Sequence, residues 1–451
     1  MLEKNSLDVL RQAVERLEAG FGSLPANSAS APAIERMAEV LMVTAERLQD
    51  NYPYFHPLYA GQMLKPPHPV ARLAYALAQW INPNNHALDG GRASTAMEME
   101  AVSELARMFG WSEHLGHLTG GGTMANLEAL WVAGRLAPEK VILASAQAHY
   151  THSRISGVLQ LKSEAIRCDA SARMDVAALQ KRLAQGDVGT VVMTMGTTAT
   201  GSVDPLPEIL ELREKYGFRV HCDAAYGGYF GLAGNLRHEA RRAFDRLCEA
   251  DSIVIDPHKH GLQPYGCGCV LFRDPAVGRF YRHDSPFTYF SSKELHLGEI
   301  SLECSRPGAA AVALWTTQKL LPLEKGEEFA KGLERCREAA LEFHRRVAQD
   351  ERFVAAFEPE LDIVVFAPNA KSASESSVLS RRIFEAAAKR SLHLAVAELP
   401  IDFFQTERAG MQKDRATLIC LRSVLMKPEH RDWIDRIWET LLESARDVLK
   451  A

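Results

Sequence analysis

A lysine between two histidines follows an apolar stretch near the middle of the chain. The segment SIVIDPHKHG (252–261) places Lys259 between His258 and His260, directly after residues typical of a buried strand. An amine brought to the end of a strand is able to form a Schiff base with a carbonyl compound. The alternative is an ordinary surface lysine in a turn, so the other segments must decide between the two.

Two further side chains stand at comparable places, each at or just after the end of an apolar stretch. Asp223 lies in HCDAAYGGYF (221–230), and a carboxylate is costly to bury unless a cation or hydrogen-bond donors meet it. His149 lies in SAQAHYTHSRISG (145–157), just after KVILAS. The simpler alternatives are a cap on the next turn for Asp223 and an ordinary exposed imidazole for His149.

A glycine-rich turn offers a site for an anion. In HLTGGGTMANLEALW (117–131), three glycines and Thr123 lead into a helix, whose free N–H groups and dipole attract negative charge. A plain helix N-cap is the alternative. We expect no strand before this turn, and its spacing is not G-x-G-x-x-G, so it is not a dinucleotide fingerprint. It also lacks the lysine of a P-loop.

Short apolar strands must position these residues. From about 95 to 320 they alternate with helix-like runs such as TAMEMEAVSELARMFGW and GTMANLEALWVAGRL, which predicts a mostly parallel sheet of an α/β fold. Such sheets bind ligands at the carboxyl ends of their strands, so Asp223 and Lys259 should lie at one edge. The predicted strands are KVILAS (140–145), TVVMTMG (190–196), RVHCDAA (219–225), SIVID (252–256) and CVLFR (269–273).

One ligand needs all the groups that these loops supply. Pyridoxal 5'-phosphate carries a phosphate for the glycine turn, a ring nitrogen for a buried carboxylate and an aldehyde for an amine. The combination is far more specific than any one of its parts. It makes the Schiff base at Lys259 the favoured interpretation.

Composition excludes several classes of protein. The 451 residues carry a net charge of −5, with 47% hydrophobic and 24% charged residues, which argues against a nucleic-acid partner. The N-terminal residues 1–20 form an amphipathic helix without the apolar core of a signal peptide, and no apolar run is long enough to span a membrane. Eight scattered cysteines favour a cytoplasmic protein, and Cys267-Gly-Cys269 lacks the second pair that a zinc site requires, so we expect no metal.

The rest of the chain divides into regions of different character. Residues 23–32 read as a polar loop, and the prolines of 51–69 predict an irregular segment. A helical stretch (308–350) precedes the C-terminal part. There RFVAAFEPELDIVVFAP, LHLAVAEL and ATLICLRSVLM predict an antiparallel sheet in a smaller α+β domain.

The motifs together resemble one family. TGGGTMANLEAL, the HY of AHYTHSRISG, GTTATGSVDPL, HCDAAYGG, DPHK and SRPG occur in the order and spacing of the group II pyridoxal-phosphate-dependent decarboxylases, which act on glutamate, aromatic amino acids and tyrosine. The resemblance covers about 50 to 450. It implies the aspartate aminotransferase fold (fold type I), with a mostly parallel seven-stranded sheet flanked by helices and a smaller C-terminal α+β domain. The expected divisions are an N-terminal segment (1–90), a large cofactor-binding domain (91–330) and a small domain (331–451).

The resemblance also implies roles for single residues. Lys259 would form the Schiff base and move protons, and Asp223 would pair with the ring nitrogen. His149 would stack on one face of the ring and Ala225 would pack against the other. Other cofactor contacts would come from Gly122, Thr123, Thr198 and His258, whereas His260 would be only a neighbour.

Substrate contacts are implied at other positions. In the family the N-terminal segment packs in an intertwined homodimer and contributes to the partner's active site, which points to Asn85 and His86 here. Arg422, in ICLRSVLMKPE, matches an arginine that approaches the substrate carboxylate; a salt bridge within the small domain is the alternative. The chain carries DPHK where many relatives have Asn before the Pro, and no segment after 325 is assignable as a mobile catalytic loop.

The expected reaction is removal of the α-carboxylate of an L-amino acid as CO2, which leaves the amine. A carbon–carbon lyase or another pyridoxal-phosphate reaction on the same site is the first alternative, because SRPG is also found in sphingosine-phosphate lyases. A non-catalytic protein that only binds the cofactor is the second. The identity of the amino acid does not follow from the sequence.

Overall fold

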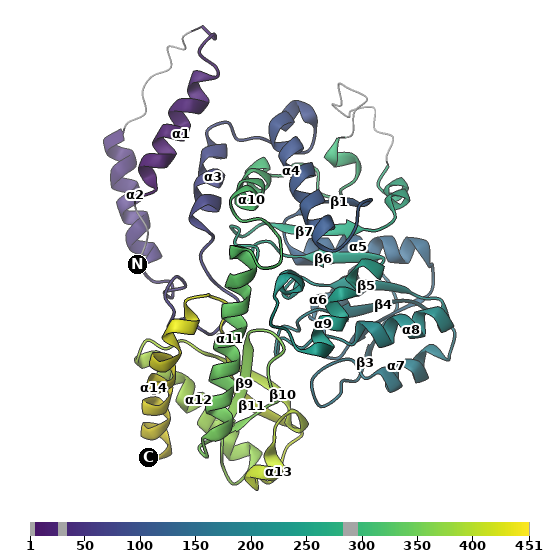
Figure 1. Cartoon of the computed structure of the whole chain (residues 1–451), viewed down its shortest axis with the longest axis vertical. Coiled ribbons are helices and arrows are strands. Elements are labelled where there is room, and N and C mark those ends of the chain that lie inside the picture. The colour runs from purple at the N-terminus through teal and green to yellow at the C-terminus, as the bar shows by residue number, and fades with distance from the viewer. Residues whose placement is uncertain (1–4, 26–33, 283–295, 451) are drawn as a thin grey trace.

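Two β-sheets and the helices around them make up the protein, seen in a computed structural model that describes residues 5–25, 34–282 and 296–450 (Figure 1). The helices are α1 (Leu7–Ala19), α2 (Ile34–Leu48), α3 (Pro69–Gln79), α4 (Leu88–Met108), α5 (Gly122–Leu136), α6 (Thr151–Val158), α7 (Val176–Leu183), α8 (Leu206–Tyr216), α9 (His238–Asp245), α10 (Gly308–Leu320), α11 (Glu328–Gln349), α12 (Ala373–Lys389), α13 (Thr406–Ala409) and α14 (His430–Leu449). The strands are β1 (Leu115–Thr119), β2 (Val141–Ser145), β3 (Ser163–Ile166), β4 (Val188–Thr194), β5 (Arg219–Asp223), β6 (Ser252–Ile255), β7 (Gly268–Phe272), β8 (Phe353–Ala355), β9 (Ile363–Pro368), β10 (Ala395–Pro400) and β11 (Thr417–Val424).

The larger sheet has seven strands in the order β1-β7-β6-β5-β4-β2-β3. The five neighbouring strands β3, β2, β4, β5 and β6 run parallel to one another. The strands β7 and β1 complete the sheet at one side, and each is antiparallel to the strand before it in the order β6-β7-β1. The strand β4 (VGTVVMT) is buried along its whole length because helices cover both faces of the sheet. The prediction of a mostly parallel α/β sheet is confirmed, and all five predicted strands are present.

Two strands of this sheet were not predicted. The strand β1 carries the buried polar residue His117, and β3 (SEAI) is a mostly exposed edge strand, so neither shows a continuous apolar run. The expectation that no strand precedes the glycine turn is therefore wrong, because β1 ends at Thr119. Since β1 is antiparallel to its neighbour, the turn still does not form a dinucleotide-binding unit.

The smaller sheet has four antiparallel strands in the order β10-β11-β9-β8, which confirms the predicted C-terminal α+β unit. It packs with α11, α12 and α14 around a separate apolar cluster that includes Phe343, Phe366 and Leu421. In Figure 1 this unit occupies the lower left, and α11 extends from it toward the large sheet. The division of the chain at residues 90 and 330 stays a prediction.

The N-terminal part has little contact with the body of the chain. The helices α1 and α2 contain no buried residue, and Figure 1 shows them as an arm at the upper left. Residues 51–68 contain no helix and no strand, as their prolines predict, and α3 begins at Pro69. Much of the polar loop predicted at 23–32 lies outside the described residues. Among the described helices, none is long and apolar enough to cross a membrane.

Candidate active site

A cavity of about 590 Å³ opens at the carboxyl ends of β4, β5 and β6, beside the start of α5. This is the edge at which open parallel sheets bind ligands. The predicted residues that line it are His149, Asp223, Gly122, Thr123, Thr198, Ala225, His258 and Lys259. The predicted substrate residues Asn85, His86 and Arg422 do not line it.

The first wall of the cavity is the start of α5. Gly121 has a φ of +148°, which only glycine adopts readily, and a Cβ at Gly122 would lie 2.7 Å from Asp256 Oδ2. No side chain caps this helix end, so its first N–H groups are not taken up by a cap. Glycine at these two positions lets the start of α5 pack closely against Asp256 and His258, and the uncapped helix end, which lines the cavity, suits an anion such as phosphate.

The second wall carries the lysine. Lys259 Nζ lies 3.0 Å from Asp256 Oδ2, and the ring of His258 lies beside the same carboxylate, with Nε2 at 3.5 Å. The Nδ1 of His258 donates to the carbonyl of Cys267 (2.8 Å), which fixes the ring. Burial lowers the pKa of His258. Asp256 was not among the predicted site residues, although it stands in the DPHK motif.

The floor of the cavity contains a buried carboxylate, Asp223. Its Oδ2 accepts a hydrogen bond from His152 Nε2 (2.8 Å) and a longer one from Asn126 Nδ2 (3.4 Å), and its Oδ1 accepts from the N–H of Ala225 (3.1 Å). Burial alone would raise the pKa of Asp223. The hydrogen bond from His152 and the nearby charge of Lys259 outweigh that effect and hold this pKa well below its usual range.

A chain of hydrogen bonds continues behind Asp223. Ser252 Oγ donates to His221 Nδ1 (2.8 Å), and His221 Nε2 donates to Asn126 Oδ1 (2.8 Å). Burial lowers the pKa of His221 to about 3, so its ring is neutral and holds one proton. Because that proton points to the amide oxygen, the amide nitrogen of Asn126 is directed to Asp223 and to the carbonyl of Gly122.

His149 is held at the cavity by the residue that starts α6. The backbone N–H and the hydroxyl of Thr151 both meet His149 Nδ1, at 3.2 and 2.7 Å. Burial lowers the pKa of His149, which favours the neutral imidazole. A neutral ring held in this way is suited to stacking on a flat ligand.

Arg422 lies behind the cavity rather than in it. This buried side chain donates to the carbonyls of Thr198 (2.7 Å), Ala199 (3.1 Å) and Gly61 (3.1 Å). It thereby ties β11 of the small sheet to the turn that carries Thr198. The salt bridge considered as its alternative role is not found among the described residues, since its guanidinium meets carbonyl groups instead.

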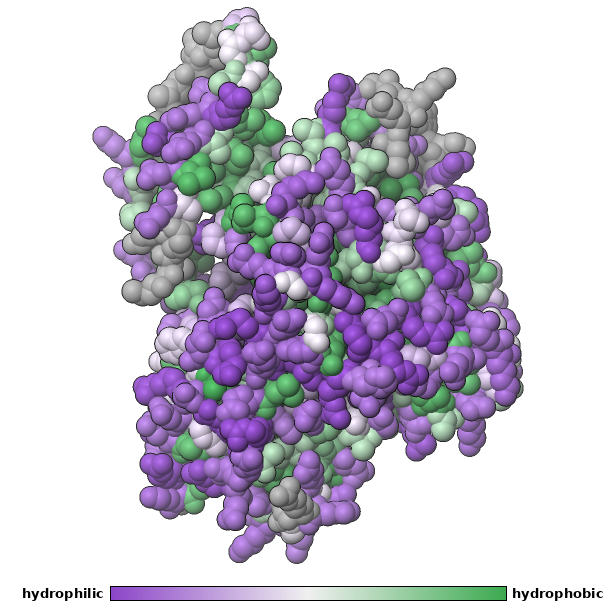
Figure 2. Space-filling model, viewed as in Figure 1, coloured by the Kyte–Doolittle hydropathy of each residue, from purple (hydrophilic) through white to green (hydrophobic). Residues whose placement is uncertain are grey.

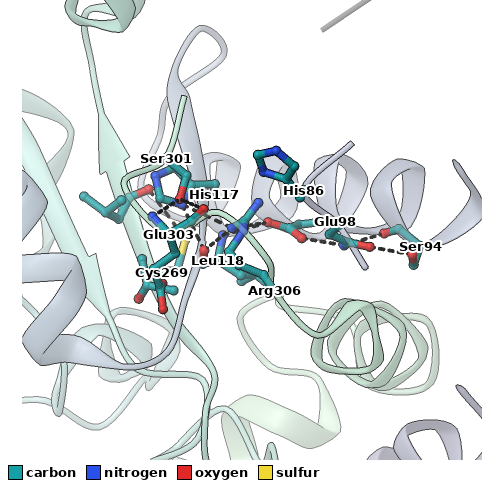
Figure 3. Close-up of polar contacts among 12 residues, drawn as sticks. His86, Ser94, Glu98, His117, Leu118, Cys269, Ser301, Glu303 and Arg306 are labelled. Atoms are coloured by element: carbon teal, nitrogen blue, oxygen red, sulfur yellow. Dashed lines mark hydrogen bonds and ion pairs between the residues drawn. The ribbon is translucent and has the colours of Figure 1, made fainter. Parts of the chain in front are cut away.

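Asn85 and His86 lie in a different polar cluster. Asn85 is fully buried, and its amide nitrogen donates to Glu98 Oε2 (2.6 Å). Figure 3 shows the surroundings, in which Arg306 of the SRPG motif reaches Glu98 and the carbonyl of Leu118. His86 packs against Gly298, whose N–H donates to the His86 carbonyl (2.9 Å). The donor of Asn85 is therefore used within the chain.

The glycine turn has one more neighbour, which was also not predicted. Glu303 Oε2 accepts from the N–H of Gly120 (2.9 Å), and Figure 3 places Glu303 beside Ser301, close to the polar cluster around Arg306. The segment that contains the SRPG motif thus supports the turn from outside the cavity. Among the described residues, no group of His, Cys, Asp and Glu side chains is arranged to hold a metal ion.

Comparison with known proteins identifies the family. The model of the pyridoxal-dependent decarboxylase conserved domain matches residues 34–368, so the chain belongs to this family. A probable L-tyrosine/L-aspartate decarboxylase of Methanothermobacter thermautotrophicus is 30% identical, and the match covers 68% of this chain and 82% of that protein. The L-tyrosine decarboxylase of Enterococcus faecium is 29% identical, with 64% of each chain covered, so this chain spans less than two thirds of that relative.

Solved structures show the same fold. Oryza sativa TDC with PLP and tryptamine has a TM-score of 0.77 at 18% identity, and the match covers 99% of both chains. The glutamate decarboxylase domain of a two-activity protein from Vibrio parahaemolyticus has a TM-score of 0.75 at 20% identity, covering 96% of this chain and 89% of that one. The predicted family, fold, cofactor and class of reaction, amino acid decarboxylation by an enzyme, are confirmed.

The cavity fits pyridoxal phosphate by its own chemistry. A helix end without a side-chain cap suits the phosphate. The ionised Asp223 suits a protonated ring nitrogen, and Lys259 supplies the amine for the aldehyde. His152 and Asn126 support Asp223, and both were missed from the sequence. His152 stands in the same AHYTHS segment as His149, but His149 precedes α6 whereas His152 lies within it, so the spacing alone does not mark His152 as facing the site.

Proposed function

We propose that the residues of the cavity divide the decarboxylation of an L-amino acid among them. Lys259 would hold the cofactor through Nζ, and Asp223 would hold a proton at the ring nitrogen. Gly122, Thr123 and His258 would contact the phosphate, and His149 and Ala225 would lie against the two faces of the ring. The single observation that supports this assignment best is that all seven residues line one cavity.

The chemistry of each group follows from its surroundings. When bound, pyridoxal phosphate supplies an electron-accepting ring, which allows the bond between Cα and the carboxylate to break. The negative charge of Asp223 is fixed before the reaction by His152, so no reorganisation is needed to keep the ring nitrogen protonated. Lys259 Nζ would return a proton to Cα after CO2 leaves. Its partner Asp256 would keep that nitrogen near the cavity.

Arg422 has a positioning role in this proposal. Its guanidinium donates to the carbonyl of Thr198, so it would set the turn that faces the cofactor rather than meet the substrate directly. Asn85 and His86 stay predictions as contacts to a substrate in a partner's active site. The buried amide of Asn85 favours a supporting role for that segment.

The relatives suggest which amino acids to test first. Those described above are named as L-tyrosine or L-tyrosine/L-aspartate decarboxylases, and another, from Thermococcus kodakarensis, is named as an L-aspartate decarboxylase. We therefore propose that the substrate is L-tyrosine or L-aspartate. The carbon–carbon lyase stays an alternative, because the same cofactor contacts serve either reaction.

The N-terminal helices support a homodimer. Ile34, Met37, Val40, Leu41 and Leu48 of α2 are all more than half exposed, and they recur at helical spacing on one face. Figure 2 shows hydrophobic side chains gathered on this arm. A contiguous exposed apolar face is typical of an interaction site. We propose that a second copy of the chain covers the apolar face of α2, with the arm beside the partner's active site. A cytoplasmic location stays a prediction that rests on the eight cysteines, all of which are free.

One experiment tests the proposed reaction directly. The purified enzyme with pyridoxal phosphate is offered each of the twenty amino acids, and released CO2 and the organic product are measured. We expect CO2 and an amine from one or a few of them, and Lys259→Ala should reduce the rate by about 10³-fold or more. An aldehyde with a shorter amine and no CO2 would favour the lyase instead.

A chemical control locates the cofactor independently of activity. Reduction with borohydride followed by digestion should leave the cofactor on the peptide that contains Lys259. The exposed Lys162→Ala variant should keep both this adduct and the activity. An adduct on another peptide, or none, would contradict the assignment of Lys259.

A further inference from the structure

A second cavity lies on the other side of the segment that carries Lys259. It has a volume of about 730 Å³ and shares no lining residue with the cofactor cavity. Its walls come from the segment before α3, from the first turns of α11 and from the turn after β11. In Figure 1, α11 runs beside the chain that connects α2 to α3. His260, the residue after Lys259, forms part of its wall.

Lys65 and Lys427 belong to the polar lining of this cavity. Lys65 Nζ donates to the carbonyl of Met426 (3.2 Å), and Lys427 Nζ donates to the carbonyl of Tyr59 (2.6 Å). Neither amine lies within 4 Å of a carboxylate in the part of the chain that the structure describes. Each ammonium group has three donors, so a carbonyl oxygen alone leaves donors for a further acceptor.

The two amines are close enough to affect each other. Burial lowers the pKa of Lys65, and burial together with the charge of Lys65 lowers the pKa of Lys427 to about 7. Lys427 is only 4% exposed. Charging two neighbouring amines in a cavity where no carboxylate meets them is costly, and an anion that contacts both would favour their charged forms.

The remaining lining indicates what kind of anion fits. Phe329, Leu333 and Pro428 give the cavity an apolar wall, while Arg72 and Lys331 add positive charge. The two lining carboxylates, Glu328 and Glu429, are fewer than the lining lysines and arginines. A small organic molecule with an apolar body and a carboxylate matches this combination.

His260 connects this cavity to the active site. Its Nε2 lies 3.1 Å from Asp362 Oδ2, and both side chains are fully buried. The other oxygen, Asp362 Oδ1, accepts from the hydroxyl of Tyr226 (2.5 Å), and Tyr226 lines the cofactor cavity. His260 is therefore two contacts away from Tyr226, a residue that lines the cofactor cavity, besides its covalent link to Lys259.

We propose that this second cavity is a binding site for a small apolar carboxylate held by Lys65 and Lys427, and that its occupancy alters the cofactor site through His260, Asp362 and Tyr226. The site is separate from the one that binds the amino acid substrate. The proposal concerns binding, so it stands or falls independently of the reaction assigned above.

Calorimetry on the holoenzyme tests the binding step. Benzoate is the probe, and benzamide, which has the same shape without the charge, is its control. We expect benzoate to bind at least about tenfold more tightly than benzamide, because hydrogen bonds to an ionised carboxylate are stronger than those to a neutral amide. Equal binding of the two probes would overturn the proposal.

Two variants separate the site from a general effect on folding. Lys65→Met and Lys427→Met should each weaken benzoate binding by about tenfold or more, yet leave the unfolding temperature unchanged or raise it, since each removes an amine whose charged form is costly in this cavity. Lys319→Met, at an exposed lysine of α10 outside the cavity, should leave binding unchanged. Full benzoate affinity in both cavity variants would contradict the site.

Crystals soaked in 4-bromobenzoate locate the probe by the anomalous signal of bromine. The signal should lie in the second cavity, and a signal only in the cofactor cavity would contradict the proposal. The coupling is measured by the visible absorbance of the bound cofactor, which should change on saturation with benzoate. Tyr226→Phe should keep benzoate binding and lose most of that change, whereas an unchanged absorbance in the unmodified enzyme would refute the coupling.

Discussion

At the scale of single residues, the active site depends on keeping a buried carboxylate charged. Asp223 is only 5% exposed, so burial alone would favour its neutral form. A neutral carboxyl group would not hold a proton on the ring nitrogen of the cofactor. The hydrogen bond from His152 therefore helps to keep Asp223 ionised, although His152 itself does not line the cavity.

We predict that His152→Phe weakens both cofactor binding and catalysis. It removes a hydrogen bond to a charged group, worth about 1.5–3 kcal/mol, so kcat/KM should fall about 10- to 100-fold. The pH profile of the cofactor's visible absorbance should also shift, which a purely structural role would not cause. His152→Gln keeps an N–H donor and should restore most of the loss; equal defects in both variants would contradict the role.

The sequence shows the residues at strand ends better than those that support them. Lys259, Asp223 and His149 were predicted because each stands next to an apolar strand. His152 and Asn126 stand within helices, where a polar residue is ordinary and nothing marks it as facing the site. Arg422 was placed near the site by resemblance, but only the structure shows that its donors are used by backbone carbonyls.

At the scale of elements, hydrogen bonds fix the sheet to the helix that starts with the glycine turn. His221 on β5 joins Ser252 on β6 to Asn126 on α5. The distance between the start of α5 and the carboxylate of Asp223 thus depends on a polar bridge rather than on apolar packing alone. The strands β4, β5 and β6 could be predicted from their apolar runs, whereas β1 and β3 could not, because their patterns are interrupted by polar residues.

This bridge should make stability depend on pH. His221 is neutral in the folded chain, with its pKa lowered to about 3, against 6.5 for a free side chain. Between these values the unfolded chain binds a proton that the folded chain does not, so stability is lost as pH falls from 6.5 toward 3. His221→Gln should reduce the slope of unfolding free energy against pH by about 1.4 kcal/mol per pH unit in this window.

Urea unfolding at several pH values measures that slope. The variant is expected to be less stable than the parent near neutral pH, since a buried hydrogen bond is weakened, and the two should approach each other as pH falls. His238→Gln is the control, because His238 lies on the surface of α9. Parallel curves for the parent and His221→Gln would contradict the linkage.

At the scale of the whole molecule, the N-terminal helices form an arm whose apolar side chains are not buried against the rest of the chain. The helices α1 and α2 bury no residue, although α2 carries a continuous apolar face. An amphipathic helix gains most of its stability from burying that face. The helix α2 would therefore be stabilised by a surface that covers its apolar face. A symmetric exchange of arms between two copies of the chain would bury both apolar faces at once.

We predict that a charge on this face separates the two copies. Leu41→Glu places a carboxylate in the centre of the apolar stripe, where burying it without a partner would be costly, so the dimer should dissociate. Light scattering after gel filtration should then change from about twice the chain mass of 49.9 kDa to that mass. Glu39→Gln, on the opposite face of α2, should leave the dimer intact. Because the arm is proposed to lie beside the partner's active site, the Leu41→Glu monomer should also lose decarboxylase activity at low protein concentration, whereas an active monomer would show that each chain holds a complete site.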